Sequence, residues 1–140
     1  MKKQRGFTLL ELLVVITIIA ILIGLASVSY STAQRKGRNA KRRGDIKTMQ
    51  NGFEQYNAQN GGAYGASCLA MVSINGVSIF PGSLPEDPKT GADYDCTSDA
   101  TSYCVCAALE TGNGNASLSD CSVIGSTSSS NPYYCAKNLQ

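Results

Sequence analysis

The fold of this chain is decided by residues 5–16, which read Arg5-Gly6-Phe7-Thr8-Leu9-Leu10-Glu11-Leu12-Leu13-Val14-Val15-Ile16. They join a short basic start to an apolar run that extends to Tyr30, and Glu11 is the only charged residue from Phe7 to Tyr30. A helix of this length rises about 36 Å, which is enough to cross a bilayer core of about 30 Å. A lone carboxylate in such a segment costs free energy, so Glu11 is a candidate functional residue that needs a partner.

The partner predicted for Glu11 is the amino group of Phe7, provided that the chain is cleaved after Gly6. Cleavage there makes Phe7 the new N-terminus, and Glu11 follows four residues later, on the same face of a helix. The pair can form within one chain or between neighbouring chains. The second arrangement favours side-by-side assembly, because an unpaired charge is most costly in apolar surroundings.

The start of the chain resembles the class III signal of type IV pilins and of the pseudopilins of type II secretion. The resemblance lies in Lys2-Lys3-Gln4-Arg5-Gly6 followed by Phe7-Thr8-Leu9-Leu10-Glu11. In that family a prepilin peptidase cuts after the glycine and methylates the new N-terminal phenylalanine. The resemblance therefore implies cleavage between Gly6 and Phe7, N-methylation of Phe7 and an assembly role for Glu11. An uncleaved signal anchor is the alternative; a secretory signal cut near Ala26 or Ala33 is disfavoured by the length of the apolar run.

After the apolar run, the pattern from Ser31 to about Asn60 remains helical but becomes amphipathic. One face carries Ile46, Met49, Phe53 and Tyr56. Asn60-Gly61-Gly62 is a helix stop. We therefore expect an α+β fold of the type IV pilin kind, with a helix over about residues 7–60 packed on a small antiparallel sheet. The expected divisions are a cleaved leader (1–6), a transmembrane and filament-core segment (7–30), an amphipathic segment (31–60) and a disulfide-stapled head (61–140).

A cluster of positive charge follows the apolar run. Its members are Arg35, Lys36, Arg38, Lys41, Arg42 and Arg43. Residues 44–140, in contrast, contain three basic and nine acidic side chains. Three interpretations stay open: a solvated helix face near lipid headgroups, a surface complementary to the acidic head of a neighbouring subunit, and a nucleic-acid patch.

All the cysteines lie in the C-terminal part of the chain, at Cys68, Cys96, Cys104, Cys106, Cys121 and Cys135. An even number in a small, loop-rich domain predicts disulfides and an oxidising compartment. The cysteines therefore place the head on the oxidising side of the membrane, and we give them more weight than the positive-inside rule, which would keep the basic cluster in the cytoplasm. Cys121 with Cys135 is a candidate pair that closes a C-terminal loop. The chain has no histidine and no C-x-x-C, so we expect neither a metal nor another cofactor.

Three strands are predicted, at residues 94–97, 102–109 and 133–137, with a turn at 98–100. In the second strand Cys104 and Cys106 share one face, and Tyr103, Val105 and Ala107 share the other. Asn75-Gly76 predicts a tight turn. The D-P-x-x-G-x-x-Y pattern from Asp87 to Tyr94 resembles the segment before the sheet in major pseudopilins. Residues 111–132 are expected to be an exposed loop, and Asp93, Asp95 and Asp99 are better explained as solvated turn residues than as calcium ligands.

No catalytic motif is recognisable, so the sequence favours a structural subunit over an enzyme. The resemblance implies a precursor in the inner membrane that prepilin peptidase and the assembly machinery convert into a homo-oligomeric type IV pilus on the cell surface. Such a filament serves adhesion, motility or DNA uptake. The alternatives are a pseudopilin of a type II secretion system and a minor pilin that binds a surface or DNA.

Overall fold

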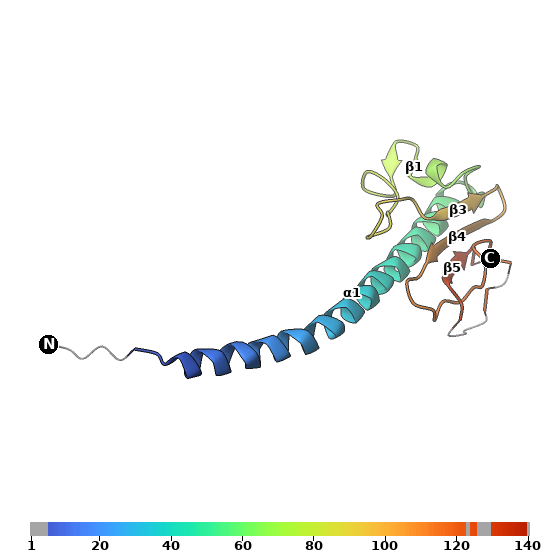
Figure 1. Cartoon of the computed structure of the whole chain (residues 1–140). Coiled ribbons are helices and arrows are strands. Elements are labelled where there is room, and N and C mark those ends of the chain that lie inside the picture. Colours follow the sequence, from blue (N-terminus) through green and yellow to red (C-terminus); the bar gives the residue numbers. More distant parts are fainter. Residues whose placement is uncertain (1–5, 123, 126–129, 140) are drawn as a thin grey trace. The chain divides into compact units, whose positions relative to one another are not determined.

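The computed structural model describes residues 6–122, 124–125 and 130–139. Of the predicted leader, only Gly6 lies within the described residues. The chain divides between residues 35 and 36 into two compact units, and each is considered separately. One helix, α1 (Leu9–Gln59), supplies most of the first unit and the start of the second (Figure 1). The helix predicted over residues 7–60 is therefore confirmed to within two residues at each end.

The first unit is a helical segment whose apolar side chains have no cover. Its large hydrophobic residues from Leu9 to Leu25 are 45–86% exposed. The most apolar window of α1 has a mean hydropathy of 2.9, so by length and composition the helix can cross a membrane. Among the described residues of this unit nothing buries the apolar side chains, because a single helix has no second layer against which to pack.

The second unit begins with residues 36–59 of α1, which supply one side of a hydrophobic core. Ile46, Met49 and Phe53 are at most 1% exposed, as their helical spacing predicts. Phe53 packs edge-on against the rings of Phe80 (5.8 Å between centroids) and Tyr103 (5.1 Å). Gly52 is required here because a Cβ at this position would overlap the Phe80 ring. The glycine that weakens the isolated helix thus allows the close packing of the folded head.

Two turns follow the pattern that their residues predict. The N–H of Gly62 donates to the carbonyl of Asn57 (2.9 Å), and Gly61 and Gly62 both have positive φ, which ends α1 as a Schellman-type cap does. A short 3₁₀ helix, η1 (Leu69–Met71), leads to a hairpin of β1 (Ser73–Ile74) and β2 (Val77–Ser78). Its two turn residues, Asn75 and Gly76, have φ of 49° and 79°, the left-handed values that a tight hairpin turn needs.

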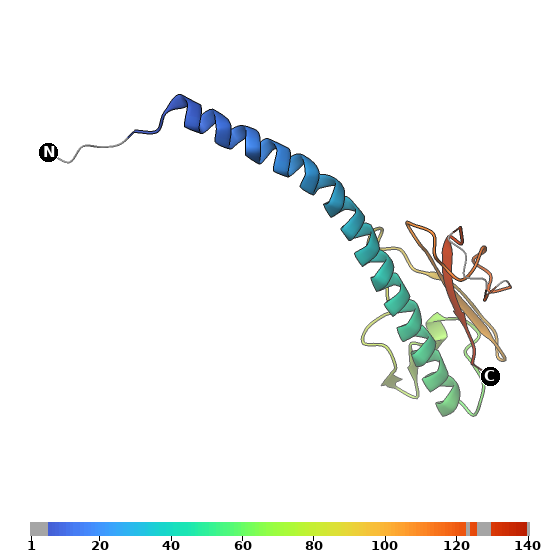
Figure 2. The same cartoon turned by 90° about the horizontal axis from the view of Figure 1, so that it is seen from below.

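The main sheet is antiparallel and has the order β3–β4–β5. Its strands are β3 (Asp95–Ser98), β4 (Tyr103–Ala108) and β5 (Tyr133–Lys137), which confirms the three predicted strands to within one residue at each end. The alternation predicted for β4 is also found: Tyr103, Val105 and Ala107 belong to the core with α1, and Cys104 and Cys106 belong to a second, smaller cluster. Figures 1 and 2 show this sheet and the β1–β2 hairpin on different sides of residues 36–59.

Three disulfides staple the head, which confirms the predicted number. They are Cys68–Cys96, Cys104–Cys121 and Cys106–Cys135. The predicted pairing of Cys121 with Cys135 is wrong. Cys135 lies directly opposite Cys106 in the β4–β5 register, so these two cysteines form a cross-strand disulfide. Cys121 is bonded to Cys104 instead.

The expectation of a wholly exposed loop at residues 111–132 is also wrong. Ala116 is fully buried and exchanges two backbone hydrogen bonds with Tyr133. The Asn115 side chain accepts from the N–H of Cys135 (2.7 Å) and donates to its carbonyl (2.8 Å). Gly114 permits this approach, because a Cβ there would overlap the Tyr133 backbone. Asn115 thereby substitutes for a strand partner, a tertiary contact that composition does not reveal.

Candidate assembly site

The predicted processing site lies just before the first turn of α1. Gly6 and Phe7 are exposed, and Phe7 retains 85% of its accessible surface. A Cβ at Gly6 would meet no atom within 4 Å, so space does not explain the glycine. Exposed, non-helical backbone is the form in which a peptidase can bind a peptide bond.

Glu11 forms a capping box with Thr8 at the start of α1. Its carboxylate accepts from the Thr8 backbone N–H (2.9 Å) and from the Thr8 hydroxyl (2.8 Å). The Thr8 hydroxyl in turn accepts from the backbone N–H of Glu11 (3.2 Å). Two N–H groups that a helix leaves without intrahelical partners are thereby satisfied. The negative charge also lies at the positive end of the helix dipole.

The capping box changes the description of Glu11. In the uncleaved chain the nitrogen of Phe7 belongs to a peptide bond, so it carries no ammonium group, and the carboxylate binds Thr8 instead. Thr8 is therefore a site residue that the sequence interpretation missed. The signal was present, since T-x-x-E ahead of an apolar run is the signature of a capping box.

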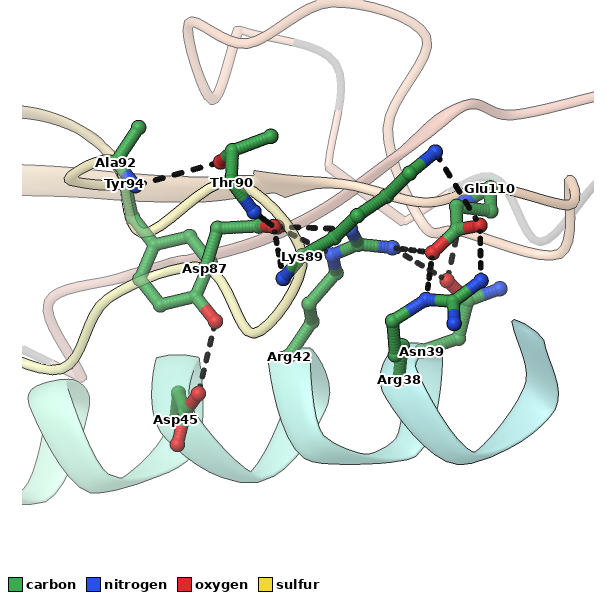
Figure 3. A network of polar contacts seen from close by, with 10 residues as sticks. All are labelled: Arg38, Asn39, Arg42, Asp45, Asp87, Lys89, Thr90, Ala92, Tyr94 and Glu110. Carbon is green, nitrogen blue, oxygen red and sulfur yellow. Dashed lines mark hydrogen bonds and ion pairs between the residues drawn. The ribbon is translucent and has the colours of Figure 1, made fainter. Parts of the chain in front are cut away.

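Part of the basic cluster lies inside the head rather than on its surface. Arg42 is only 3% exposed. Its Nε and NH2 atoms donate to both carboxylate oxygens of Asp87, as Figure 3 shows. One turn earlier, Arg38 donates through Nε and NH2 to both oxygens of Glu110. Paired contacts of this kind are the strongest hydrogen bonds available to arginine.

The two ion pairs are joined into one network. Arg42 NH1 also donates to Glu110 (3.0 Å) and to the Asn39 side-chain oxygen (3.0 Å). Asn39 accepts from the backbone N–H of Glu110 (3.0 Å) and donates to the Thr111 hydroxyl (2.8 Å). The network therefore fastens the segments before β3 and after β4 to the same turns of α1 (Figure 3).

These contacts shift the pKa values of the charged groups. Hydrogen bonds from Arg42 hold the pKa of Asp87 well below its usual range. Hydrogen bonds from Arg38, followed by those from Arg42, lower the pKa of Glu110 to about 2. The pKa of Arg42 is raised, mainly by its hydrogen bond to Asp87. All three groups are therefore charged at neutral pH.

The D-P-x-x-G-x-x-Y pattern is explained by the same network. The Asp87 carboxylate accepts from the backbone N–H groups of Lys89 (2.8 Å) and Thr90 (3.0 Å), which holds the loop in shape. Gly91 has a positive φ of 67°. The hydroxyl of Tyr94 donates to Asp45 on α1 (2.8 Å), and the buried Tyr94 has a raised pKa, chiefly because of burial. The pattern thus encodes a loop that is anchored to the helix at both ends.

The six residues of the basic cluster therefore do not share one exposed surface, because Arg42 is buried and Arg38 is half-buried. Arg38 and Arg42 neutralise acids of their own head. Arg43 donates to the carbonyl of Asn113 (2.6 Å) and lies 5.6 Å from the centre of the Tyr134 ring. Lys36 and Lys41 remain exposed. Arg35, which belongs to the first unit, is exposed as well. The complementarity between basic helix and acidic head exists, but it lies largely within one subunit.

The candidate metal ligands do not come together. Asp99 accepts from the hydroxyl of Thr101 (2.7 Å) and from the N–H groups of Thr101 (2.7 Å) and Ser102 (2.8 Å), so it stabilises the β3–β4 turn, and these bonds lower its pKa to about 2. Asp93 and Asp95 are exposed. Among the described residues, the group with metal-like spacing is Cys104, Cys106 and Cys121, whose sulfurs are held in disulfides.

Comparison with known proteins agrees with the prepilin-type start of the chain. The family described as "Prokaryotic N-terminal methylation motif" matches residues 1–27. The type II secretion system core protein G of Escherichia coli (strain K12) is 40% identical over 58 residues, which are 41% of this chain and 40% of that protein. The chain therefore carries a prepilin-type N-terminal methylation motif and is distantly similar to a type II secretion pseudopilin. No solved structure was found to match it.

The comparisons bear on the processing and the location of the chain. The chain spans about two fifths of the length of core protein G. Its methylation motif and apolar helix indicate a precursor in the inner membrane, and the family implies processing by a prepilin peptidase followed by assembly.

Proposed function

We propose that this chain is a filament subunit that polymerises through the first half of α1. The observation that carries the proposal is the exposure of the large apolar residues from Leu9 to Leu25 in a chain with an N-terminal methylation motif. Each large aliphatic side chain gains about 1.5–3 kcal/mol on full burial, so removal of this surface from water is a strong cohesive force. Lipid covers it in the precursor, and neighbouring helices cover it in the filament.

The proposed sequence of events assigns a role to each segment. Residues 1–6 are removed by cleavage between Gly6 and Phe7, and Phe7 is methylated. Residues 7–30 pass from the membrane into the filament core, residues 31–60 join the core to the head, and residues 61–140 form the outer surface. Glu11 then compensates the amino group that cleavage creates at Phe7, in its own chain or in the next one.

The filament that we propose first is a type IV pilus on the cell surface, used for adhesion, motility or DNA uptake. The second candidate is a periplasmic pseudopilus that drives protein secretion. The observation that favours the second is the 40% identity to a type II secretion core protein over 58 residues. Both assemblies need the same processing and the same helical core, so they differ in where the filament is found.

Intact mass spectrometry tests the processing and the destination together. Protein sheared from intact cells is compared with protein from the membrane fraction, with and without reduction. We expect residues 7–140 plus one methyl group, with an increase of about six protons on reduction of three disulfides. A methylated product confined to the periplasm and membrane supports the pseudopilus. A mass that retains Met1 to Gly6 contradicts the filament and supports a signal anchor.

Two substitutions of Glu11 separate its charge from its capping function. Glutamine is accepted in a capping box, so Glu11→Gln keeps the cap and removes the charge, whereas Glu11→Ala removes both. We expect both variants to be cleaved at Gly6 and both to yield at least about tenfold fewer filaments. Normal assembly of Glu11→Gln would show that capping, and not charge compensation, is what the carboxylate contributes.

A further inference from the structure

The surface of the head contains a basic groove beside its ion-pair network. Residues 36–43 of α1 and the segment 111–113 line a cavity of about 440 Å³. The residues that line it are Lys36, Asn39, Ala40, Arg43, Thr111, Gly112 and Asn113. This lining includes two cations and no carboxylate. We call it the basic groove.

The two cations of the basic groove differ in how they are held. Arg43 is held in place by the Asn113 carbonyl and the Tyr134 ring, so little further ordering is needed when it binds an acid. Lys36 is exposed and forms no ion pair within the described residues. The nearby Glu110 cannot compensate them, because Arg38 and Arg42 already bind both of its oxygens.

A second surface of the same head has the opposite charge. Glu86 and Asp93 are partners in an antiparallel bridge, and Asp95 follows two residues later at the start of β3, so alternation along the strand places Asp93 and Asp95 on one face. All three are exposed, and none forms an ion pair within the part of the chain that the structure describes. β3 is an outer strand of its sheet. We call Glu86, Asp93 and Asp95 the acidic edge.

The two surfaces cannot neutralise each other within one head. The acidic edge belongs to the loop that Asp87 and Tyr94 fasten to Arg42 and Asp45 of α1 (Figure 3). At about 100° per residue, Lys36 and Arg43 lie roughly 100–120° around the helix from Arg42. Two complementary surfaces on different faces of one molecule pair between copies, in a head-to-tail contact that repeats without closing into a dimer.

We propose that the basic groove binds the acidic edge of a second copy of this chain. The contact rests on the proposed filament, in which it joins the globular heads of successive subunits, and an open, repeating contact is the geometry that a filament requires. Lys36 and Arg43 of one copy face Asp93 and Asp95 of the next. Its main contribution is register between subunits, because exposed ion pairs contribute little free energy individually but like charges placed together are strongly disfavoured.

Charge reversal with rescue tests this contact in the full-length chain in its own cells. Lys36→Glu and Asp93→Lys are each expected to reduce the yield of sheared filaments at least about tenfold, and the double variant is expected to recover at least half of the yield. Lys41→Glu is the matched control, because it makes the same charge change on the same helix outside the basic groove. Its yield is expected to stay within about twofold of the unaltered chain.

The remaining outcomes are distinguishable. Intact mass first establishes that each variant is cleaved, methylated and fully disulfide-bonded. If the unaltered chain forms no filament, the proposed function fails and the contact fails with it. If it does form filaments, normal yield of Lys36→Glu, absence of rescue in the double variant, or equal loss in Lys41→Glu overturns the contact alone. Loss of DNA binding by Lys36→Glu with normal filaments also overturns it, and assigns the basic groove to nucleic acid.

Discussion

The two ends of α1 are built from similar apolar residues but differ in what covers them. Ile16 and Ile18 in the first half are 55% and 52% exposed, whereas Ile46 and Phe53 in the second half are fully buried. In the second half the apolar residues form one stripe that β4 and the segment 64–80 cover. In the first half they occur all round the helix, and they are exposed.

This difference separates the two tasks of the chain. The second half completes a core within one subunit, so it determines the stability of the head. The first half exposes its apolar side chains, so under the proposed function it determines where the chain resides and whether it assembles. Substitutions that change the stability of the head without changing assembly, or the reverse, therefore test whether the two halves of α1 act independently.

The largest effect is expected for Phe53→Ala, which leaves a cavity beneath Phe80 and Tyr103. Loss of a buried phenylalanine costs about 4 kcal/mol of the free energy of unfolding of the head. Denaturant unfolding in detergent, followed by the near-ultraviolet signal of the tyrosines, measures it. Ile16→Ala is the control and should change this free energy by less than about 0.5 kcal/mol. Equal losses in the two variants would show that the halves of α1 are not independent.

A slightly smaller loss is expected when Cys68 and Cys96 are both replaced by serine. Their disulfide closes a loop with a sequence separation of 28, and chain-entropy estimates give about 3.5 kcal/mol for a loop of this length. The head should then be digested by protease faster than the helix. Unchanged protease resistance of residues 61–140 would exclude this disulfide as a major staple.

Arg42→Ala is expected to destabilise the head by about 3 kcal/mol, since it leaves Asp87 without its arginine partner in a partly buried site and removes one of the two arginines that bind Glu110. The same unfolding experiment measures the effect. Lys41→Ala removes an adjacent exposed charge and should fall within about 0.5 kcal/mol of the unaltered chain. A neutral Arg42→Ala would mean that the network contributes to specificity and not to stability.

The smallest effect is expected from pH. Because the folded pKa of Glu110, about 2, lies below its ordinary value, the unfolded chain binds the proton first as the pH falls. The contribution of Glu110 to stability is therefore complete above about pH 5 and declines from about pH 4.5 towards pH 2. Unfolding of the head at pH 6 and pH 3 measures the decline, and Glu110→Gln should make it shallower. An equal decline in that variant would assign the pH dependence to other carboxylates.

Prediction from the sequence succeeded where a local rule decides the structure. The spacing of Ile46, Met49 and Phe53 identified the buried face of α1, and Asn75-Gly76 identified a hairpin turn. The alternation in residues 103–107 separated the core face of β4 from its disulfide face. Each of these signals depends on helix or strand periodicity or on the φ values that a turn requires, and neighbouring residues are sufficient to define it.

Prediction failed where distant segments meet. Cys135 pairs with Cys106 because the register of β4 and β5 places the two opposite each other, and cysteine spacing does not contain that register. Arg38 and Arg42 appeared to belong to a basic surface because their acidic partners, Glu110 and Asp87, follow 72 and 45 residues later. Thr8 is a different case, because its capping box is local and was overlooked.

The sequence by itself determined the N-terminal methylation motif, the membrane-length helix, the predicted processing site at Gly6-Phe7 and the disulfide-rich head. These features are encoded in contiguous residues whose hydropathy, charge and spacing act locally. Only the tertiary structure decided which charges are paired inside the head and which remain exposed on its surface. That division depends on which segments the sheet and the disulfides bring against α1, because a charge is neutralised by what lies within a few ångströms of it and not by what adjoins it in the chain.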